Sequence, residues 1–190
     1  MRIIDNAITT LVGEDSRSNR LKGILAAPNG SLYGIPFSAR RVVKFNPIDK
    51  SMTHIGPDFG DGKWHNGAMT DNGVIYCPPS DSHRRGILKI DTKNDTATEL
   101  DANLLPQQGG GMWMSCAVAL DGCIYFMPWN AHRIMKLDPN NNDTISSVGY
   151  DLGEGLRKYI GTVVGIDGCV YGIPYHSSRI LKYDSINDIT

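Results

Sequence analysis

The chain has 190 residues, of which 41% are hydrophobic, and its 19 Lys and Arg residues nearly balance its 20 Asp and Glu residues. This length suits one domain with a sizeable core. The formal net charge of −1 excludes the broad basic surface of a general nucleic-acid binder. No apolar run approaches the length needed to span a bilayer, and the start lacks the apolar region of a signal peptide. We therefore expect no membrane association, and the absence of a disulfide pattern favours a cytoplasmic location without establishing it.

The composition favours β-structure over helices. Gly (21) and Pro (10) are frequent, and only Glu14, Glu99 and Glu154 are glutamates, so the other acidic residues are aspartates. Aspartate prefers turns, because its short side chain bonds nearby backbone amides, whereas glutamate favours helices. In chain order, the first predicted element is a strand at residues 7–13.

A repeated element then follows four times along the chain. Each copy is an Asn-Gly or Asp-Gly pair followed by an apolar strand that contains tyrosine and ends near proline; the copies lie at residues 29–36, 72–79, 121–128 and 167–174. Asn-Gly and Asp-Gly pairs are typical of hairpin turns. A strand of small residues precedes each turn, at residues 24–26, 67–69, 116–118 and 162–164.

A lysine-containing strand follows each tyrosine strand. These strands alternate apolar residues around Lys44, Lys89, Lys136 and Lys182, and each ends in Asn or Asp. We expect each lysine to lay its aliphatic stem on the sheet and to hold its ammonium group at the sheet edge or against an aspartate. A ring of cationic ligand contacts is the alternative.

The repeat predicts the fold class: an all-β β-propeller of four blades, each of about 46 residues and four antiparallel strands. The whole chain, 1–190, is then one domain, with repeats at about 20–62, 63–108, 109–155 and 156–190. The strand at 7–13 would complete the last blade. Three arrangements remain open: a closed four-bladed ring, a ring shared by two copies, and a segment of a longer array.

The repeats resemble those of β-propellers such as the YVTN, virginiamycin-B-lyase-like and kelch-like groups. The residues that carry this resemblance are the Asp-Gly-x-Ile-Tyr element, the Arg-x-x-Lys-x-Asp strand and the Ile-Gly or Val-Gly strand end. The chain lacks the paired glycines of kelch blades and the Trp-Asp dipeptide of WD40 blades. The resemblance implies architecture and transfers no catalytic residue, because fold and function separate readily.

Two sets of loops on one face of such a propeller carry the candidate ligand-binding residues. They are aromatic residues and histidines that lie either at the start of the first strand of a blade or just after the second strand: Trp64, His65, Trp113, Trp129, His132, Tyr159, Tyr175 and His176. Flat rings with His and Arg suit a sugar ring, a planar ligand or a peptide. The alternative is that Trp64, Trp113 and Tyr159 are wedges between blades, because a residue that recurs in every blade favours a structural role.

The sequence predicts neither a metal site nor a cofactor. The five histidines have no zinc spacing, and the acidic loops at 58–62 and 151–155 lack the ligand set of calcium. We expect a non-catalytic binding or scaffold module for a small molecule, glycan or protein partner, with a homodimer that shares one ring as a further possibility. The alternatives are a lyase or lactonase with His132 or His176 as general acid or base, and a purely structural repeat segment.

Overall fold

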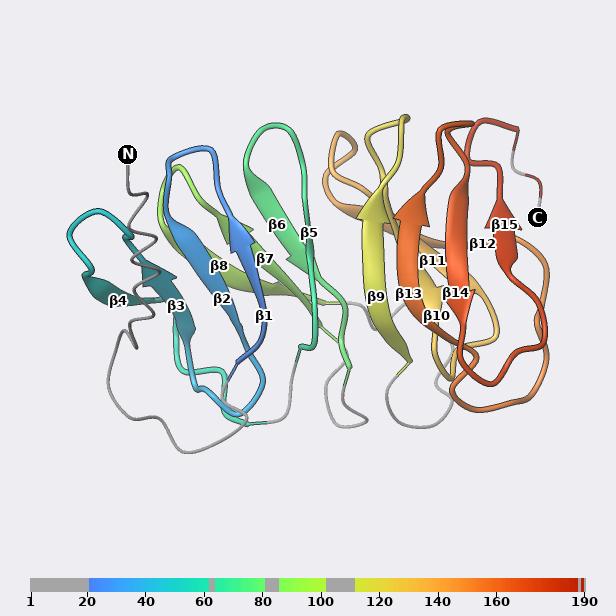
Figure 1. The fold of residues 1–190 in the computed structure, drawn as a ribbon, viewed down its shortest axis with the longest axis horizontal. Helices are drawn as coiled ribbons and strands as arrows, with labels where there is room; N and C mark the ends of the chain where they lie inside the picture. Colours follow the sequence, from blue (N-terminus) through green and yellow to red (C-terminus); the bar gives the residue numbers. More distant parts are fainter. Residues whose placement is uncertain (1–20, 62–63, 81–85, 102–111, 188, 190) are drawn as a thin grey trace, which may run out of the picture.

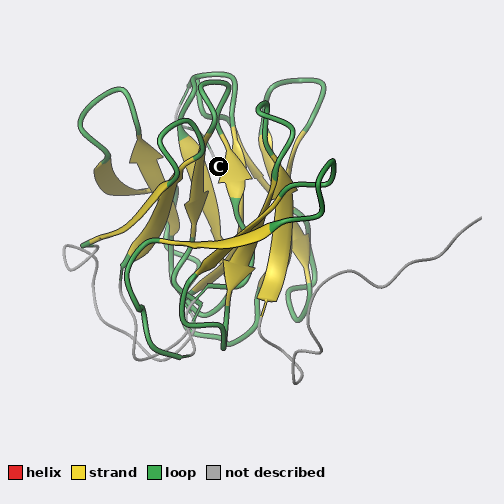
Figure 2. Cartoon of the chain, turned by 90° about the vertical axis from the view of Figure 1, so that its left-hand side faces the viewer, coloured by secondary structure: helices red, strands yellow, loops and turns green. Residues whose placement is uncertain are grey.

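The structure is a computed structural model that describes residues 21–61, 64–80, 86–101, 112–187 and 189. All regular elements in these ranges are strands (Figure 2). None of the described elements is a helix long and apolar enough to cross a membrane. The predicted strand at 7–13 lies outside the described residues.

The strands form four antiparallel sheets that follow one another along the chain (Figure 1). The first sheet contains β1 (Leu21–Ala26), β2 (Leu32–Pro36), β3 (Val42–Phe45) and β4 (Met52–Ile55), and the second contains β5 (Ala68–Met69), β6 (Val74–Cys77), β7 (Ile87–Asp91) and β8 (Thr96–Leu100). The third contains β9 (Trp113–Val118), β10 (Ile124–Pro128), β11 (Ile134–Asp138) and β12 (Thr144–Val148). The fourth contains β13 (Tyr159–Val164), β14 (Val170–Pro174) and β15 (Leu181–Tyr183).

This arrangement confirms the predicted fold class, an all-β β-propeller whose chain forms four blades. In each sheet the strands pair in chain order, as in a propeller blade. The inner strand β9 contacts the inner strands β5 and β13 of the neighbouring blades, and the hydroxyls of Ser115 in β9 and Thr162 in β13 are 2.7 Å apart. In Figure 1 the first blade (blue) and the fourth blade (orange to red) stand at opposite ends of the long axis.

The hairpin turns form as the Asn-Gly and Asp-Gly pairs predict. Gly30, Gly73, Gly122 and Gly168 all have a positive φ, between 77° and 84°. Glycine adopts this left-handed conformation without steric cost, which explains why the same residue recurs at every turn.

Three hydrophobic clusters hold consecutive blades together. The first cluster joins residues such as Tyr33 and Ile35 of the first blade to Ile75 and Leu88 of the second, and equivalent clusters join the second blade to the third and the third to the fourth. Among the described residues, no cluster joins the first blade to the fourth. Each inner blade therefore has both of its faces covered by neighbours.

The lysine prediction is also confirmed. The ammonium groups of Lys44, Lys89, Lys136 and Lys182 each pair with an aspartate, at N–O distances between 2.5 and 3.3 Å. Each ammonium also lies 5.5–5.9 Å from the ring centroid of the tyrosine on the neighbouring strand. The stem thus covers the tyrosine ring while the charge is held by a carboxylate.

Candidate functional site

The eight predicted site residues fall into two groups that differ in exposure. Trp64, Trp113 and Tyr159 are buried in the clusters between blades. Trp129, His132 and His65 are half-buried, Tyr175 is 52% exposed, and His176 is exposed. Only the second group offers ring surface to a ligand in this conformation.

The buried rings have the positions of wedges. Trp64, Trp113 and Tyr159 lie opposite Pro79, Pro128 and Pro174 across the first strand pair of their blades. The indole Nε1 of Trp64 donates a hydrogen bond to the carbonyl oxygen of Gly86 at 2.9 Å, and that of Trp113 to the carbonyl oxygen of Arg133 at 3.2 Å. Each indole therefore fills the space between blades and ties its inner strand to the start of the third strand of the same blade.

Three residues of this second group contact one another ring to ring and form what we call the aromatic platform: Trp129, Tyr175 and His176. The ring centroids of Trp129 and Tyr175 are 5.2 Å apart with an interplanar angle of 39°. Those of Tyr175 and His176 are 4.8 Å apart, with the rings nearly parallel at 21°. Trp129 belongs to the third blade, and Tyr175 and His176 belong to the fourth, so the aromatic platform bridges two blades.

Backbone hydrogen bonds of a third loop bring these rings together. The amide of Lys158 donates to the carbonyl oxygen of Trp129 at 2.7 Å, and the carbonyl oxygen of Lys158 accepts from the amide of Tyr175 at 2.8 Å. The amide of His176 donates to the carbonyl oxygen of Arg157 at 3.0 Å. The loop before β13 thus runs between the two aromatic loops and sets their spacing.

The buried side chain of Lys158 also holds the same loops together. It is buried, and its ammonium group donates to the carbonyl oxygens of Gly155, Ala131 and Asn130 at 2.7, 3.1 and 3.4 Å. Burial lowers the pKa of Lys158, although the negative charges of Glu154 and Asp151 act in the opposite direction. The loops that carry the aromatic platform are therefore pre-organised rather than free to collapse on a ligand.

His132 lies beside two acidic residues of the loop that follows β12. Its Nδ1 is 3.5 Å from a carboxylate oxygen of Asp151, and its Nε2 is 3.8 Å from one of Glu154. These distances are longer than a hydrogen bond and describe an electrostatic pairing when the imidazole is protonated. In the described part of the chain, no group of three or more His, Cys, Asp or Glu residues could hold a metal ion.

His65 is not part of this arrangement. It follows Trp64 at the junction of the first and second blades. There its backbone carbonyl oxygen lies close to Gly23 of β1, because a Cβ added to Gly23 would be only 3.3 Å from that oxygen. Burial lowers the pKa of His65, and the positive charge of Lys22 lowers it further. The ammonium of Lys22 also lies 5.3 Å from the ring centroid of Phe37. This smaller cluster occupies the same kind of loop as the aromatic platform but two blades away.

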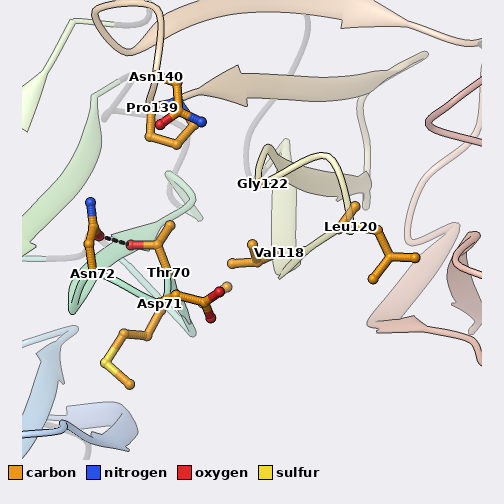
Figure 3. Close-up of a pocket in the computed structure, with 11 residues that line it drawn as sticks. Thr70, Asp71, Asn72, Val118, Leu120, Gly122, Pro139 and Asn140 are labelled. Carbon is orange, nitrogen blue, oxygen red and sulfur yellow. Dashed lines mark hydrogen bonds between the residues drawn. The ribbon is translucent and has the colours of Figure 1, made fainter.

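A cavity lies at the opposite ends of the strands, between the second and third blades (Figure 3). Its volume is about 670 Å³, and its lining comes from the hairpin turn after β5, the end of β9 with its turn, and Pro139 and Asn140. The hydroxyl of Thr70 bonds the side-chain oxygen of Asn72 at 2.5 Å in this wall (Figure 3). The loops of the aromatic platform and this cavity are on opposite faces, because antiparallel strands alternate their turns between two ends.

Comparisons with known proteins place the chain in the class of β-propellers. Virginiamycin B lyase from Staphylococcus aureus superposes with a TM-score of 0.66 at 17% identity, over 86% of this chain and 55% of the lyase. A catalytically inactive histidine-to-alanine variant of that lyase, with quinupristin, superposes with a TM-score of 0.64 at 15% identity, over 88% of this chain and 57% of the other. The predicted resemblance to virginiamycin-B-lyase-like propellers is thus confirmed as a likeness of fold.

Proteins with other roles share this fold. A candidate 6-phosphogluconolactonase from Bacteroides uniformis matches with a TM-score of 0.62 at 15% identity, over 88% of this chain and 52% of that one. The extracellular domain of a candidate hybrid two-component system from B. thetaiotaomicron matches with a TM-score of 0.62 at 12% identity, over 80% of this chain and 19% of that one. The chain spans about half the length of the lyase and of the lactonase. No protein-family model matches it, and no curated protein sequence matches it significantly.

Proposed function

We propose that this protein is a non-catalytic β-propeller binding module that takes a ring-shaped ligand, such as a sugar ring or a planar small molecule, on the aromatic platform. The observation that carries the proposal is the row of rings formed by half-buried Trp129 and exposed Tyr175 and His176, with centroids 5.2 and 4.8 Å apart. Such a surface offers aromatic faces for stacking together with an imidazole that can make directed hydrogen bonds.

Pre-organisation supports this role. Buried aromatic residues fill space, but an exposed stack that fills no core is not explained by packing. Lys158 holds the loops of the aromatic platform through six hydrogen bonds of its backbone amide, carbonyl and ammonium groups. A ligand that binds there would not have to order these loops, so less of the interaction energy would be lost on binding.

Tryptophan fluorescence tests the proposal directly. The chain has three tryptophans, and two of them, Trp64 and Trp113, are buried, so Trp129 is the tryptophan within reach of a ligand. We expect a member of a glycan and small-molecule library to change the emission, and we expect Trp129→Ala or Tyr175→Ala to weaken its binding about tenfold or more, which corresponds to ~1.4 kcal/mol.

Phe37→Ala is the matched control, because Phe37 has the position in the first blade that Trp129 has in the third, directly after the strand-ending proline. It should leave ligand binding unchanged. If no library member perturbs the emission, or if Phe37→Ala weakens binding as much as Trp129→Ala, the aromatic platform is not the binding site.

The alternative function is catalysis of the lyase or lactonase kind. It is favoured by the pairing of His132 with the carboxylates of Asp151 and Glu154 and by the fold shared with virginiamycin B lyase, of which a histidine-to-alanine variant is catalytically inactive. In this case His132 or His176 would act as general acid or base. Turnover of cyclic ester substrates that is abolished by His132→Ala or His176→Ala, with binding retained, would replace the non-catalytic proposal.

A further inference from the structure

The outer faces of the first and fourth blades carry apolar residues at positions that are buried everywhere else in the repeat. In the fourth blade, Ile173 is 43% exposed and Ile180 is 63% exposed. In the repeat, the position of Ile173 lies two residues after the repeated tyrosine, and the position of Ile180 lies two residues before the repeated lysine. In the inner junctions the residues at these positions, namely Ile35, Met127, Val42, Ile87 and Ile134, are fully or almost fully buried.

The first blade shows the same contrast on its opposite face. Leu21 is 37% exposed, whereas the equivalent rings of Trp64, Trp113 and Tyr159 are buried. Leu32, Val43 and Phe45 are only half-buried. Their equivalents in the second, third and fourth blades are all buried between blades: Ile75, Ile124 and Val170; Leu88, Met135 and Leu181; Ile90, Leu137 and Tyr183.

These two surfaces are the two halves of one kind of interface. The fourth-blade face, made by Tyr171, Ile173 and Ile180, corresponds to the face that every earlier blade presents to the next blade. The first-blade face, made by Leu21, Leu32, Val43 and Phe45, corresponds to the face that every later blade presents to the preceding one. Each face therefore exposes apolar residues at positions that a neighbouring blade covers at the inner junctions.

The charged groups at the two outer faces differ from those at the inner junctions. At the inner junction between the first two blades, the amide of Asn29 and the carboxylate of Asp95 meet at the hydroxyl of Tyr33, at 2.9 and 2.7 Å. On the outer faces, Asp167 has the hairpin position of Asn29, and Lys50 has the turn position of Asp95, with the same left-handed backbone at φ 61° against 53°. Asp167 on the fourth-blade face already pairs with Lys182 of its own blade at 3.0 Å, so Lys50 would add a second positive charge beside that ion pair. The apolar residues, and not these charges, therefore carry the proposed pairing.

The relative placement of the blades also favours an incomplete circle. The four blades superpose as a unit on a little over half of the virginiamycin B lyase chain, 55%. They therefore follow the curvature of a longer propeller, and in Figure 1 the first and fourth blades stand at opposite ends. Within the part of the chain that the structure describes, no hydrophobic cluster joins the first-blade face to the fourth-blade face.

We propose that two copies of this chain associate head to tail, with the fourth-blade face of each copy on the first-blade face of the other, to close a shared eight-bladed ring. Heterologous contacts of this kind close into rings when the rotation between copies allows it. The occupant of each face is a second copy, because this chain itself carries the complementary face. The proposal is independent of the aromatic platform, which lies at the loops between the third and fourth blades.

Mass photometry and sedimentation velocity on the 190-residue chain test the proposal. We expect a species of twice the 20.8 kDa of one chain at micromolar concentration, and we expect Ile180→Asp or Leu21→Asp to weaken dimerisation at least tenfold. Leu156→Asp is the matched control, because Leu156 is 66% exposed in the loop between the third and fourth blades, outside both faces. Circular dichroism verifies that each variant keeps its β-structure.

Mixing two variants distinguishes head-to-tail pairing from pairing of like faces. The Ile180→Asp variant keeps an intact first-blade face, and the Leu21→Asp variant keeps an intact fourth-blade face. Each variant alone should be monomeric, and their mixture should form a heterodimer through one intact junction. A wild-type monomer at tens of micromolar, a dimer that survives either single substitution, or a mixture that stays monomeric would each overturn the proposal.

Discussion

The carboxylate of Asp143 joins the second and third blades, and its loss should destabilise the protein measurably. It accepts a hydrogen bond from the hydroxyl of Tyr76 at 2.6 Å and pairs with the ammonium of Lys89 at 2.5 Å. We choose Asp143→Asn, because Asp143 has a left-handed backbone (φ 55°) that asparagine tolerates. Hydrogen bonds to a charged group contribute ~1.5–3 kcal/mol against ~0.5–1.5 for neutral pairs.

The substitution weakens the hydrogen bond from Tyr76 and removes the ion pair with Lys89, for an expected loss of about 1–3 kcal/mol in the free energy of unfolding. For a chain of this size, this loss lowers Tm by roughly 3–10 °C. Chemical denaturation followed by fluorescence measures the loss. The expected coupling between Asp143 and Lys89, from a double-mutant cycle with Lys89→Met, is about 1 kcal/mol.

The repeat supplies an internal control. Asp95 receives the same two donors from Tyr33 and Lys44, both at 2.7 Å, but its side chain is 44% exposed against 16% for Asp143. Solvent screens the more exposed pair, so Asp95→Asn should cost less than Asp143→Asn. Equal losses for the two aspartates, or an additive cycle, would refute the argument that burial makes this contact strong.

Three further predictions concern titratable groups. The four cysteines are buried free thiols, and burial raises the pKa of Cys123 to about 11. We therefore expect almost no reaction of the cysteines with a disulfide reagent at pH 8 until denaturant is added. Rapid labelling of the native protein would contradict this. Burial alone would raise the pKa of Asp121, but hydrogen bonds from the Tyr125 hydroxyl, the Cys123 amide and the Lys136 ammonium group lower it overall. The stability that this carboxylate contributes is therefore complete above about pH 4 and is lost as the pH falls further. Acid unfolding followed by circular dichroism should accordingly be less steep in Asp121→Asn. Burial, aided by Lys22, lowers the pKa of His65, so its NMR titration midpoint should lie below 6.5 and rise in Lys22→Ala, and a midpoint above 6.5 would be inconsistent with this environment.

Periodicity made most of the fold predictable. Trp64, Trp113 and Tyr159 could be placed at equivalent positions because each precedes the turn glycine by the same interval, and the strand register places each of them opposite a repeated proline. Equivalent residues in a repeat meet equivalent neighbours, so one interface describes the others. The pattern could not decide whether these rings contact ligand or fill space, because exposure depends on how closely neighbouring blades approach.

The aromatic platform could be predicted only in part. Trp129 and Tyr175 were identifiable as loop residues, but their contact depends on backbone hydrogen bonds through Lys158. Nothing in the sequence indicates that Lys158 is buried, since a lysine in a loop usually reaches solvent. Its burial follows from three carbonyl oxygens that converge on one ammonium group. The cavity in Figure 3 was likewise not predicted, because its wall combines turns from two blades.

Residues that break the repeat are where individual functions can reside. A residue that recurs in all blades meets the same interface each time, which leaves it little freedom to bind a ligand. Trp129 has Ser80 as its equivalent in the second blade, and Lys50 stands where the three other repeats have aspartate in the sequence. The first departure places a ring on the loop face, and the second changes the charge of an outer blade face. Because the two departures lie at separate places in the fold, ligand binding and self-association can be tested, and lost, independently of each other.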